Sequence, residues 1–434
     1  MPTPRASRSN RALKRAGVAA LGLLLLAGCA EDKPLNTFEP RGDRAQGIYN
    51  LMSPIWYIMG VIFVAVIGGT IVLALKNRVN GDELDPEDLP HQTHGNTRLE
   101  VGWTILPGVL LAAISIPVVA NIWKLEEKNQ PGQLDVLVIG QQWTWSYRYD
   151  TDGDGFFVDA NGDGKVDEAD KKFPLDTALD PDDVVTQNEL VMPVGQQVDL
   201  TITSRDVIHS FWIPRLNGKR DAVPGKFSTW SLQANEPGKY TGWCTEFCGL
   251  SHARMRMDAI VLTEADFNTW LENQQRPAEV PDEATDPDAF AGRQLFINQC
   301  VSCHVIREAP GPDAIPYAPG FQANLKSGYA PDLTHFATRS VFAGGIYSQY
   351  EGKGTDANDD ALDVSDYLRL PELAKADPQS RDDYRWNTAE LKRWIANAPA
   401  RKDMAPDDLR GMLPFPALTD QQLDQLSAYL ATLD

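Results

Sequence analysis

The stretch Cys244-Thr245-Glu246-Phe247-Cys248-Gly249-Leu250-Ser251-His252-Ala253-Arg254-Met255 gathers two cysteines, a histidine and a methionine within twelve residues. A further histidine, His209, lies upstream. Thiolate, imidazole and thioether together form the ligand set that copper prefers. The spacing is too crowded for one face of a helix and predicts a tight loop between two strands. In such a loop the two thiolates could bridge two copper ions, with His209 and His252 each capping one of them.

A disulfide or a zinc site is the alternative interpretation of this loop. Zinc sites rarely recruit methionine, and structural zinc sites favour paired Cys-x-x-Cys knuckles, which this loop does not have. The ligand chemistry therefore favours copper.

The loop resembles the binuclear copper A loop of cytochrome c oxidase subunit II, and Ser204–Phe211 resembles the upstream histidine loop of that family. The resemblance implies that the two cysteines bridge the coppers. It also implies that Glu246 ligates copper through its backbone carbonyl, while its side chain reaches a magnesium ion shared with subunit I. The ligand side chains that the resemblance implies are those of His209, Cys244, Cys248, His252 and Met255.

A second cofactor motif follows in Cys300-Val301-Ser302-Cys303-His304. Cys-x-x-Cys-His is the attachment motif of c-type haem, in which two thioethers hold the vinyl carbons and the adjacent imidazole ligates the iron. Cys300 and Cys303 are therefore the predicted attachment points, and His304 is the predicted axial ligand. A helical pattern over Ala289–Phe296 leads into the motif.

The C-terminal region resembles a class I cytochrome c, a small helical fold wrapped around its haem. Ala330–Leu333 resembles the loop whose proline carbonyl orients the axial histidine. The sixth ligand should be a late methionine, and Met404 and Met412 compete for this role. Met412 is favoured by its spacing to Thr419, which caps a last amphipathic helix, although Leu413 interrupts the usual Met-Pro pair.

The chain is strongly acidic, with 40 Lys plus Arg against 60 Asp plus Glu and a formal net charge of -20 over 434 residues. This charge argues against nucleic-acid binding and fits the steering of a basic redox partner, although solubility alone would also explain it. No cysteine is left over for a structural disulfide. The five cysteines are Cys29, Cys244, Cys248, Cys300 and Cys303.

Residues 1–29 have the pattern of a bacterial lipoprotein signal peptide, with a basic start and a short apolar run. The run ends in Leu26-Ala27-Gly28-Cys29, which resembles a lipobox and predicts lipidation of Cys29 on the outer face of the membrane. An uncleaved anchor with an incidental cysteine is the alternative.

Residues 30–131 are predicted to form a transmembrane hairpin. Two apolar segments, at roughly residues 55–75 and 101–123, are each about 20 residues long, enough to cross a bilayer as a helix. The lipobox predicts that the chain starts outside the bacterial plasma membrane, crosses it twice and returns outside. The family resemblance implies that Glu100 sits at the mouth of a proton pathway into subunit I; alternatively, Glu100 marks the wet end of the second helix.

Residues 132–262 change to the period of strands and predict a Greek-key sandwich or barrel, which in the copper A family is cupredoxin-like. Gln142–Tyr147 resembles the aromatic strand of that family, and Trp143 matches the tryptophan through which electrons enter. The family usually has another aromatic residue where this chain has Thr144. The strand candidates are Leu134–Gly140, Val184–Leu190, Gln197–Thr203, Thr229–Leu232 and Met257–Leu262.

An insertion at residues 150–183 contains a calcium-loop pattern that the family does not require. Oxygen ligands fall at positions 1, 3, 5, 9 and 12 with glycine at position 6, although position 12 is the shorter aspartate. Asp150, Asp152 and Asp154 begin a poorer, overlapping copy, and a solvated acidic insertion is the alternative. The candidate calcium-binding residues are Asp159, Asn161, Asp163, Lys165, Asp167 and Asp170.

The remaining segments complete the predicted organisation. Residues 263–287 form a short helix, Thr263–Gln275, and a Pro-rich acidic linker, and residues 288–434 form the cytochrome c domain. An acidic insertion at Tyr347–Tyr384 has no predicted role.

The expected fold is a multidomain membrane protein with a two-helix hairpin, an all-β cupredoxin-like barrel and a small all-α cytochrome c domain. The expected function is electron transfer from haem c to copper A and on to haem a of oxidase subunit I, which reduces oxygen. Subunit III is an expected further partner, and quinol-cytochrome c reductase or a small cytochrome c is the expected donor. The alternatives are a quinol oxidase subunit II, which lacks copper ligands, a copper-delivery or thiol-redox lipoprotein, and a nitrous oxide reductase module.

Overall fold

The computed structural model describes most of the chain, including both predicted cofactor motifs. The predicted signal peptide with Cys29 and the linker after the membrane hairpin lie outside the described residues. The described residues are 34–78, 95–125, 133–167, 169–172, 183–311, 314–315, 330–352, 364–375, 384–408 and 410–434.

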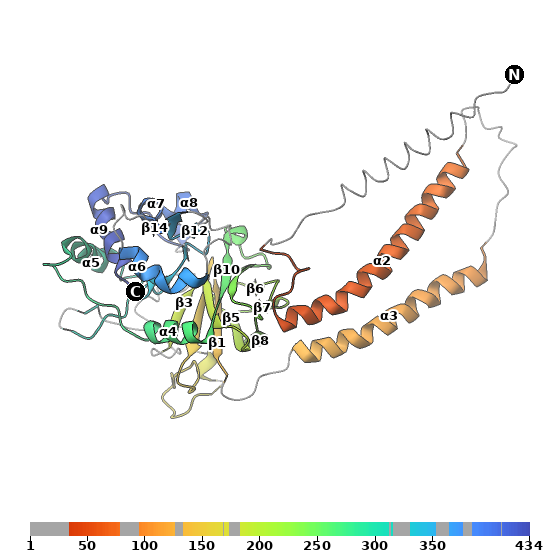
Figure 1. The fold of residues 1–434 in the computed structure, drawn as a ribbon, viewed down its shortest axis with the longest axis horizontal. Coiled ribbons are helices and arrows are strands. Elements are labelled where there is room, and N and C mark those ends of the chain that lie inside the picture. The colour runs from red at the N-terminus through yellow and green to blue at the C-terminus, as the bar shows by residue number, and fades with distance from the viewer. Residues whose placement is uncertain are drawn as a thin grey trace, which may run out of the picture.

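Two long helices, α2 (Asp43–Lys76) and α3 (Thr97–Leu125), run side by side away from the globular part (Figure 1). Both are longer than the apolar segments predicted from the sequence. Their apolar side chains are exposed along most of their length, and both helices are long and apolar enough to cross a membrane. The first turn of α2 is fastened to the globular part, because Ala45 N donates to Leu216 O at 3.1 Å.

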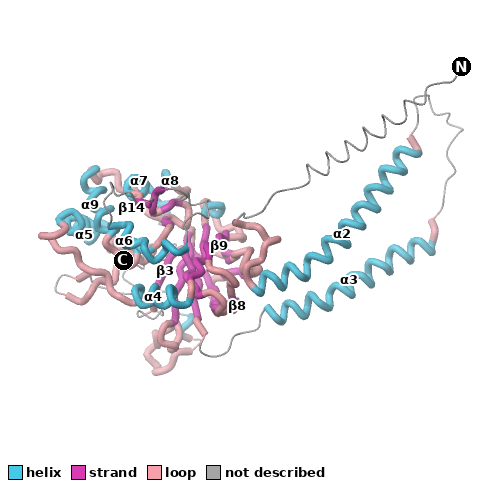
Figure 2. The backbone as a smooth tube through the Cα atoms, viewed as in Figure 1, coloured by secondary structure: helices cyan, strands magenta, loops and turns pink. Residues whose placement is uncertain are grey.

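The β-region contains two main sheets, one of five strands in the order β3-β2-β1-β5-β8 and one of three strands in the order β4-β10-β9 (Figure 2). A further pair, β6 and β7, lies beside them. The strands are β1 (Asp135–Gln141), β2 (Thr144–Asp150), β3 (Val184–Gln187), β4 (Glu189–Pro193), β5 (Val198–Ser204), β6 (His209–Phe211), β7 (Arg220–Ala222), β8 (Ser228–Leu232), β9 (Gly238–Trp243) and β10 (Arg256–Leu262).

Buried apolar and aromatic side chains of both sheets form one core. Tyr149 of β2 also ties the sheets together, because its hydroxyl donates to Val191 O of β4 at 3.0 Å and accepts from Val191 N at 2.8 Å. The sandwich predicted from the short, β-branched strands is therefore confirmed.

The predicted single strand Val184–Leu190 is wrong, because the chain changes sheets within it. Asn188 has a φ of 63° and separates β3 in one sheet from β4 in the other. Asparagine tolerates this left-handed conformation better than most residues. Its side-chain oxygen accepts hydrogen bonds from Thr144 Oγ1 at 2.8 Å and from Trp145 N at 3.2 Å, which fixes the crossing point.

The C-terminal region is mainly helical, and its first and last helices, α5 and α9, pack against each other. Asp286 caps α5 by accepting from Ala289 N at 3.1 Å, and Thr419 with Gln422 forms a capping box at α9, as such sequence patterns predict. The helices after the β-region are α4 (Glu264–Gln274), α5 (Pro287–Gln299), α6 (Leu370–Lys375), α7 (Thr388–Ala396), α8 (Ala398–Arg401) and α9 (Asp420–Ala431). The short strands are β11 (Val341–Phe342), β12 (Tyr347–Ser348), β13 (Tyr350–Gly352) and β14 (Tyr384–Trp386).

The acidic insertion, which the sequence left without a role, contributes to the contact between the β-region and the helical region. Its described part contains Tyr367, Leu370 and Leu373, which belong to the same buried cluster as the two sheets. The hydroxyl of Tyr367 also donates to the carboxylate of Glu189 in β4 at 2.9 Å. Within the described residues, the two regions therefore share one apolar core.

A buried ion pair holds α5 against the chain that follows the Cys-x-x-Cys-His motif. Arg293 Nε and Nη2 donate to the two carboxylate oxygens of Glu308, each at 2.7 Å, and both side chains are at most 1% exposed. Tyr429 Oη at 3.0 Å and Ile315 N at 2.8 Å donate to the same carboxylate. All four acceptor directions of this buried anion are therefore occupied.

We expect Arg293→Met to destabilise the helical region by about 3–5 kcal/mol, because it leaves the carboxylate of Glu308 buried without its cation. Urea unfolding of the full-length protein in detergent, followed by near-ultraviolet circular dichroism, measures the change. Arg385→Ala is the matched control: its pair with Glu351, at 3.2 Å, is exposed and should contribute no more than about 1 kcal/mol. Equal effects of the two substitutions would contradict the prediction.

Candidate copper and haem sites

The predicted copper loop connects β9 to β10, as its crowded spacing indicated. Cys244 N donates to Met255 O at 3.0 Å and closes the base of the loop, and a short 3-10 turn, His252–Arg254, lies inside it. His209 comes from β6, at the end of a separate connection. Residues from two distant stretches of the sequence therefore meet at one end of the sheets.

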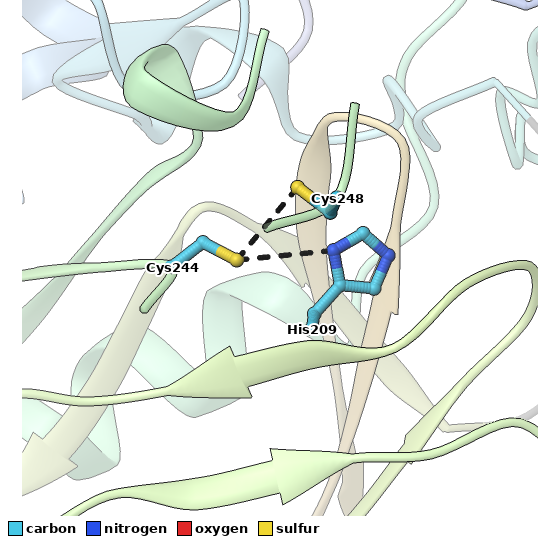
Figure 3. A group of neighbouring side chains, drawn as sticks. All are labelled: His209, Cys244 and Cys248. Atoms are coloured by element: carbon cyan, nitrogen blue, oxygen red, sulfur yellow. Dashed lines mark hydrogen bonds between the residues drawn. The ribbon is translucent and has the colours of Figure 1, made fainter. Parts of the chain in front are cut away.

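Figure 3 shows the side chains of His209, Cys244 and Cys248 turned toward one another. The two sulfur atoms lie 3.8 Å apart, and His209 Nδ1 lies 3.9 Å from the sulfur of Cys244. All three residues are buried, with exposed fractions of 0%, 3% and 2% in the order given. The donor atoms of these three residues lie close enough together to bind the same metal ion.

The other three predicted ligands lie around the same pair of sulfurs. His252 Nδ1 is 3.5 Å and Met255 Sδ is 3.8 Å from the sulfur of Cys248. The backbone carbonyl of Glu246 is 3.3 Å from the sulfur of Cys244. Two thiolates, two imidazoles, a thioether and a carbonyl thus surround one small space, and this donor set fits two soft or borderline copper ions.

The two thiols are electrostatically unequal. A hydrogen bond from Cys248 lowers the pKa of Cys244 to about 4, helped by His209 and opposed by burial. The same interaction, together with burial, raises the pKa of Cys248. The metal-free pair therefore shares one proton, and Cys244 is the thiolate that forms first.

Asp206 positions the ring of His209, and the sequence analysis did not identify it. Its carboxylate lies 2.9 Å from His209 Nε2 and accepts from the backbone N–H of Gln142 at 2.8 Å. An N–H at Nε2 leaves the lone pair of Nδ1 directed at the cysteines, which is the tautomer that ligation requires. Burial alone would lower the pKa of His209, but the hydrogen bond to Asp206 raises it above its usual value.

The Cys-x-x-Cys-His motif lines a cavity of about 250 Å³ between the helical region and the β1–β2 turn. His304 Nδ1 lies 2.8 Å from the carbonyl oxygen of Pro331, the contact that the resemblance to class I cytochromes predicted. Burial lowers the pKa of His304, so the ring is held neutral with Nε2 available as a ligand atom. A mostly apolar cavity beside two cysteines and an oriented imidazole fits a covalently attached haem.

Both candidate methionines, Met404 and Met412, line this cavity together with Cys300 and Cys303. The structure therefore brings the whole predicted set together without separating the two candidates for the sixth ligand. Met412 therefore remains the predicted sixth ligand, because of its spacing to Thr419 in the sequence.

Trp143 lies between the two sites. The residue is 4% exposed and lines the haem cavity. On its other side, Trp143 Nε1 donates to the carbonyl oxygen of Cys248 at 3.0 Å. One residue therefore contacts both the copper loop and the cavity that contains the haem motif.

The remaining predicted site residues lie away from Trp143 and the two cofactor sites. Glu100 is on the first turn of α3, at the end of the hairpin that points away from the globular part (Figure 1). In the candidate calcium loop, the carboxylate of Asp159 accepts from the backbone N–H groups of residues 162–164, and Asp170 is buried and accepts from Ala160 N. In the part of the chain that the structure describes, the poorer copy brings one oxygen each of Asp150, Asp152 and Asp154 within 4.8 Å of one another.

Comparisons with known proteins agree with this architecture. Residues 134–263 match the family model "Cytochrome C oxidase subunit II, periplasmic domain", and residues 289–434 match the family model "Cytochrome c". The fold and its two sites thus define a membrane protein with a cupredoxin-like region and a cytochrome c region in one chain.

Among similar proteins, cytochrome c oxidase subunit 2 of Alkalihalophilus pseudofirmus is 28% identical over 90% of this chain and 93% of its own length. Cytochrome c oxidase subunit 2 of Bacillus sp. (strain PS3) is 29% identical over 74% of this chain and 81% of its own length. That of Arabidopsis thaliana is 30% identical over 54% of this chain and 86% of its own length. The chain belongs to the cytochrome c oxidase subunit 2 family.

We expect the metal-free protein to form one cysteine thiolate near pH 4 rather than near pH 9, because Cys248 donates to Cys244. Since the pKa of Cys244 is lower in the folded state, the stabilisation it contributes is complete above the usual thiol pKa and is lost as the pH falls through about 4. Ultraviolet thiolate absorbance against pH measures the transition. Cys244→Ser should abolish the low-pH step, and Cys248→Ala, which removes the hydrogen-bond donor, should move it upward. A wild-type transition that occurs only near the usual thiol pKa would contradict the prediction.

Proposed function

We propose that this chain is the electron-transfer subunit of a haem-copper terminal oxidase. Electrons pass from its haem c to its copper A centre and then to haem a of subunit I. Subunit I reduces oxygen to water and couples the reaction to proton translocation. The observation that carries the proposal is the position of Trp143, which contacts the copper loop on one side and the haem cavity on the other.

The copper loop supplies the ligands in this proposal. The bridging thiolates of Cys244 and Cys248 would delocalise charge over two copper ions, so that little geometry changes when an electron arrives. His209, His252 and Met255 would complete the shell with the carbonyl of Glu246. Burial of the sulfurs excludes water, and Asp206 keeps His209 in the ligating tautomer.

The cytochrome c region supplies the second centre. Cys300 and Cys303 would attach the haem, which exchanges single electrons, and His304 with Met412 would be its axial ligands. The carbonyl of Pro331 fixes the ring of His304, and the apolar cavity wall excludes water. A soluble cytochrome c or a quinol-cytochrome c reductase would be the external donor, and the acidic surface of the chain suits a basic partner.

The copper loop also presents an apolar surface for a partner subunit. Phe247 is 77% and Leu250 is 62% exposed, beside the exposed side chain of Glu246. Such exposed apolar residues are typical of protein interfaces. We assign this surface to subunit I, with Glu246 reaching a shared magnesium ion, and Glu100 to the mouth of a proton pathway at the other end of the hairpin. Subunit III is a further partner in this proposal.

The location in this proposal is a bacterial plasma membrane, crossed by α2 and α3, with the cupredoxin-like and cytochrome c regions on the outer face. The two apolar helices and the family match to a periplasmic domain support this orientation. Lipidation at Cys29 would add a second anchor.

The decisive experiment measures the cofactors of the full-length protein purified in detergent. We expect two coppers that share one unpaired electron in electron paramagnetic resonance of the oxidised form, and one covalent haem per chain. Cys248→Ser should remove the shared-electron signal and keep the haem, because it deletes one bridging sulfur. Haem with one copper or none in the wild-type protein would contradict the proposed function.

We propose further that the loop Asp159–Asp170 binds calcium as a structural ion. The carboxylate of Asp159 already organises the turn by accepting from Gly162 N at 2.8 Å and Gly164 N at 2.6 Å. Calcium at about 100 times its dissociation constant should stabilise the folded protein by about 2.7 kcal/mol. Thermal unfolding with calcium and with a chelator measures this shift. Asp159→Asn should abolish the shift, and Glu279→Gln, an exposed control, should keep it.

A further inference from the structure

A buried lysine, Lys402, joins the two regions beside both candidate sites, although neither ligand set includes it. Its side chain is 2% exposed. Its Nζ donates to the backbone carbonyl of Trp143 at 2.8 Å and to that of Ala343 at 2.9 Å. A buried lysine is costly unless its hydrogen bonds are made, and here two of them are made to backbone carbonyls.

The two carbonyls belong to different regions of the molecule. Trp143 is in the β1–β2 turn of the cupredoxin-like region, whereas Ala343 follows β11 in the cytochrome c region. Lys402 itself directly follows α8. One amine therefore fastens a turn of the first region to two segments of the second.

The adjoining turn leaves space for this amine. Gly344 has a φ of +81°, and a Cβ at this position would collide with Nζ of Lys402 and lie 2.6 Å from the carbonyl oxygen of Trp143. The carbonyl of Gly344 accepts from Arg256 N of the cupredoxin-like region at 3.1 Å, so the turn is held from both sides. Glycine is the residue that this close approach requires.

Lys402 and the two carbonyls that it binds form a clamp, which adjoins the haem cavity and is connected to the copper loop through Trp143. Lys402, Trp143 and Ala343 all line the cavity that contains the haem motif. The indole of Trp143 continues the connection by donating to the carbonyl of Cys248 at 3.0 Å. A chain of hydrogen bonds thus runs from the cytochrome c region, through Lys402 and Trp143, to a ligand of the copper loop.

The clamp does not depend on the charge of the amine. Burial lowers the pKa of Lys402 to about 7, and a neutral amine still has two N–H groups for the two carbonyls.

We propose that Lys402 is a positioning residue for electron transfer, which holds the main chain of Trp143 against the cytochrome c region and so fixes Trp143 between the haem and copper centres. This inference rests on the proposed function. Transfer between two centres depends steeply on their separation and relative orientation, so a small shift of the residue between them lowers the rate. Lys402 would act through Trp143 and need not touch either cofactor.

The test compares the full-length holoprotein in detergent with Lys402→Met, which keeps the length of the side chain but loses both hydrogen bonds. After flash reduction of the haem, the rate of electron transfer to copper is measured together with copper and haem content and the copper resonance. We expect the rate to fall about tenfold or more, because misplacement of a group in the reacting geometry is this costly. Cofactor content and the copper resonance should stay at wild-type values.

Two further variants separate positioning from general stability. Lys402→Arg retains donors for both carbonyls and should restore part of the rate. Lys375→Met removes an exposed lysine of the same region, whose Nζ pairs with Asp434 at 2.6 Å, and should leave the rate unchanged.

A wild-type transfer rate in Lys402→Met, or a rate loss matched by an equal loss of cofactor, would overturn the inference. If Lys402→Met does not fold, the transfer rate and the unfolding midpoint of Lys402→Arg test the inference. Slower transfer at the wild-type unfolding midpoint would support positioning, whereas a wild-type rate with a lowered midpoint would show a structural role only. A wild-type protein without two coppers or without haem would instead refute the proposed function.

Discussion

Two hydrogen bonds end on the carbonyl oxygen of Cys248, one from Gln142 Nε2 at 2.7 Å and one from Trp143 Nε1 at 3.0 Å. These bonds hold the β1–β2 turn against the copper loop. Separating the two would leave the buried carbonyl of Cys248 without a donor, which costs free energy. Gly249 follows with a φ of +108°, and a Cβ there would lie 2.9 Å from Gln142 Nε2. The geometry of the predicted copper ligands thus depends on a turn 106 residues earlier in the chain.

The β1–β2 turn is also fixed from the cytochrome c region, because Lys402 donates to the carbonyl of Trp143. A second set of contacts between the two regions surrounds Glu189 of β4. Burial raises the pKa of Glu189, whose carboxylate accepts from Ser340 N at 3.1 Å and from Tyr367 Oη at 2.9 Å across the boundary of the two regions. These contacts surround a shared apolar core. A cytochrome c region held in this way keeps its haem motif at one separation from the copper loop.

Local patterns predicted much of this arrangement. The loop Cys244–Met255 was recognisable because its predicted copper ligands lie close together in the sequence. The haem motif Cys300–His304 was recognisable for the same reason. The two apolar helices followed from length and composition alone. The crossing of the chain at Asn188 was not predictable in this way, because the polar residues 186–189 between Val185 and Leu190 do not reveal which sheet each half of the stretch joins. The structure does not choose between Met404 and Met412 as the sixth haem ligand, because both line the same cavity. The preference for Met412 therefore rests on the sequence alone.

The sequence by itself determined which atoms are available: the sulfurs, imidazoles and thioethers of the two motifs, and the two segments that can cross a membrane. Only the tertiary structure decided that the two motifs share Trp143, that Asp206 orients His209, and that Lys402 joins the two regions. Lys402 and Trp143 are 259 residues apart. A hydrogen bond between such distant segments leaves no spacing or periodicity in the sequence, because it arises from the packing of elements that are far apart in the chain.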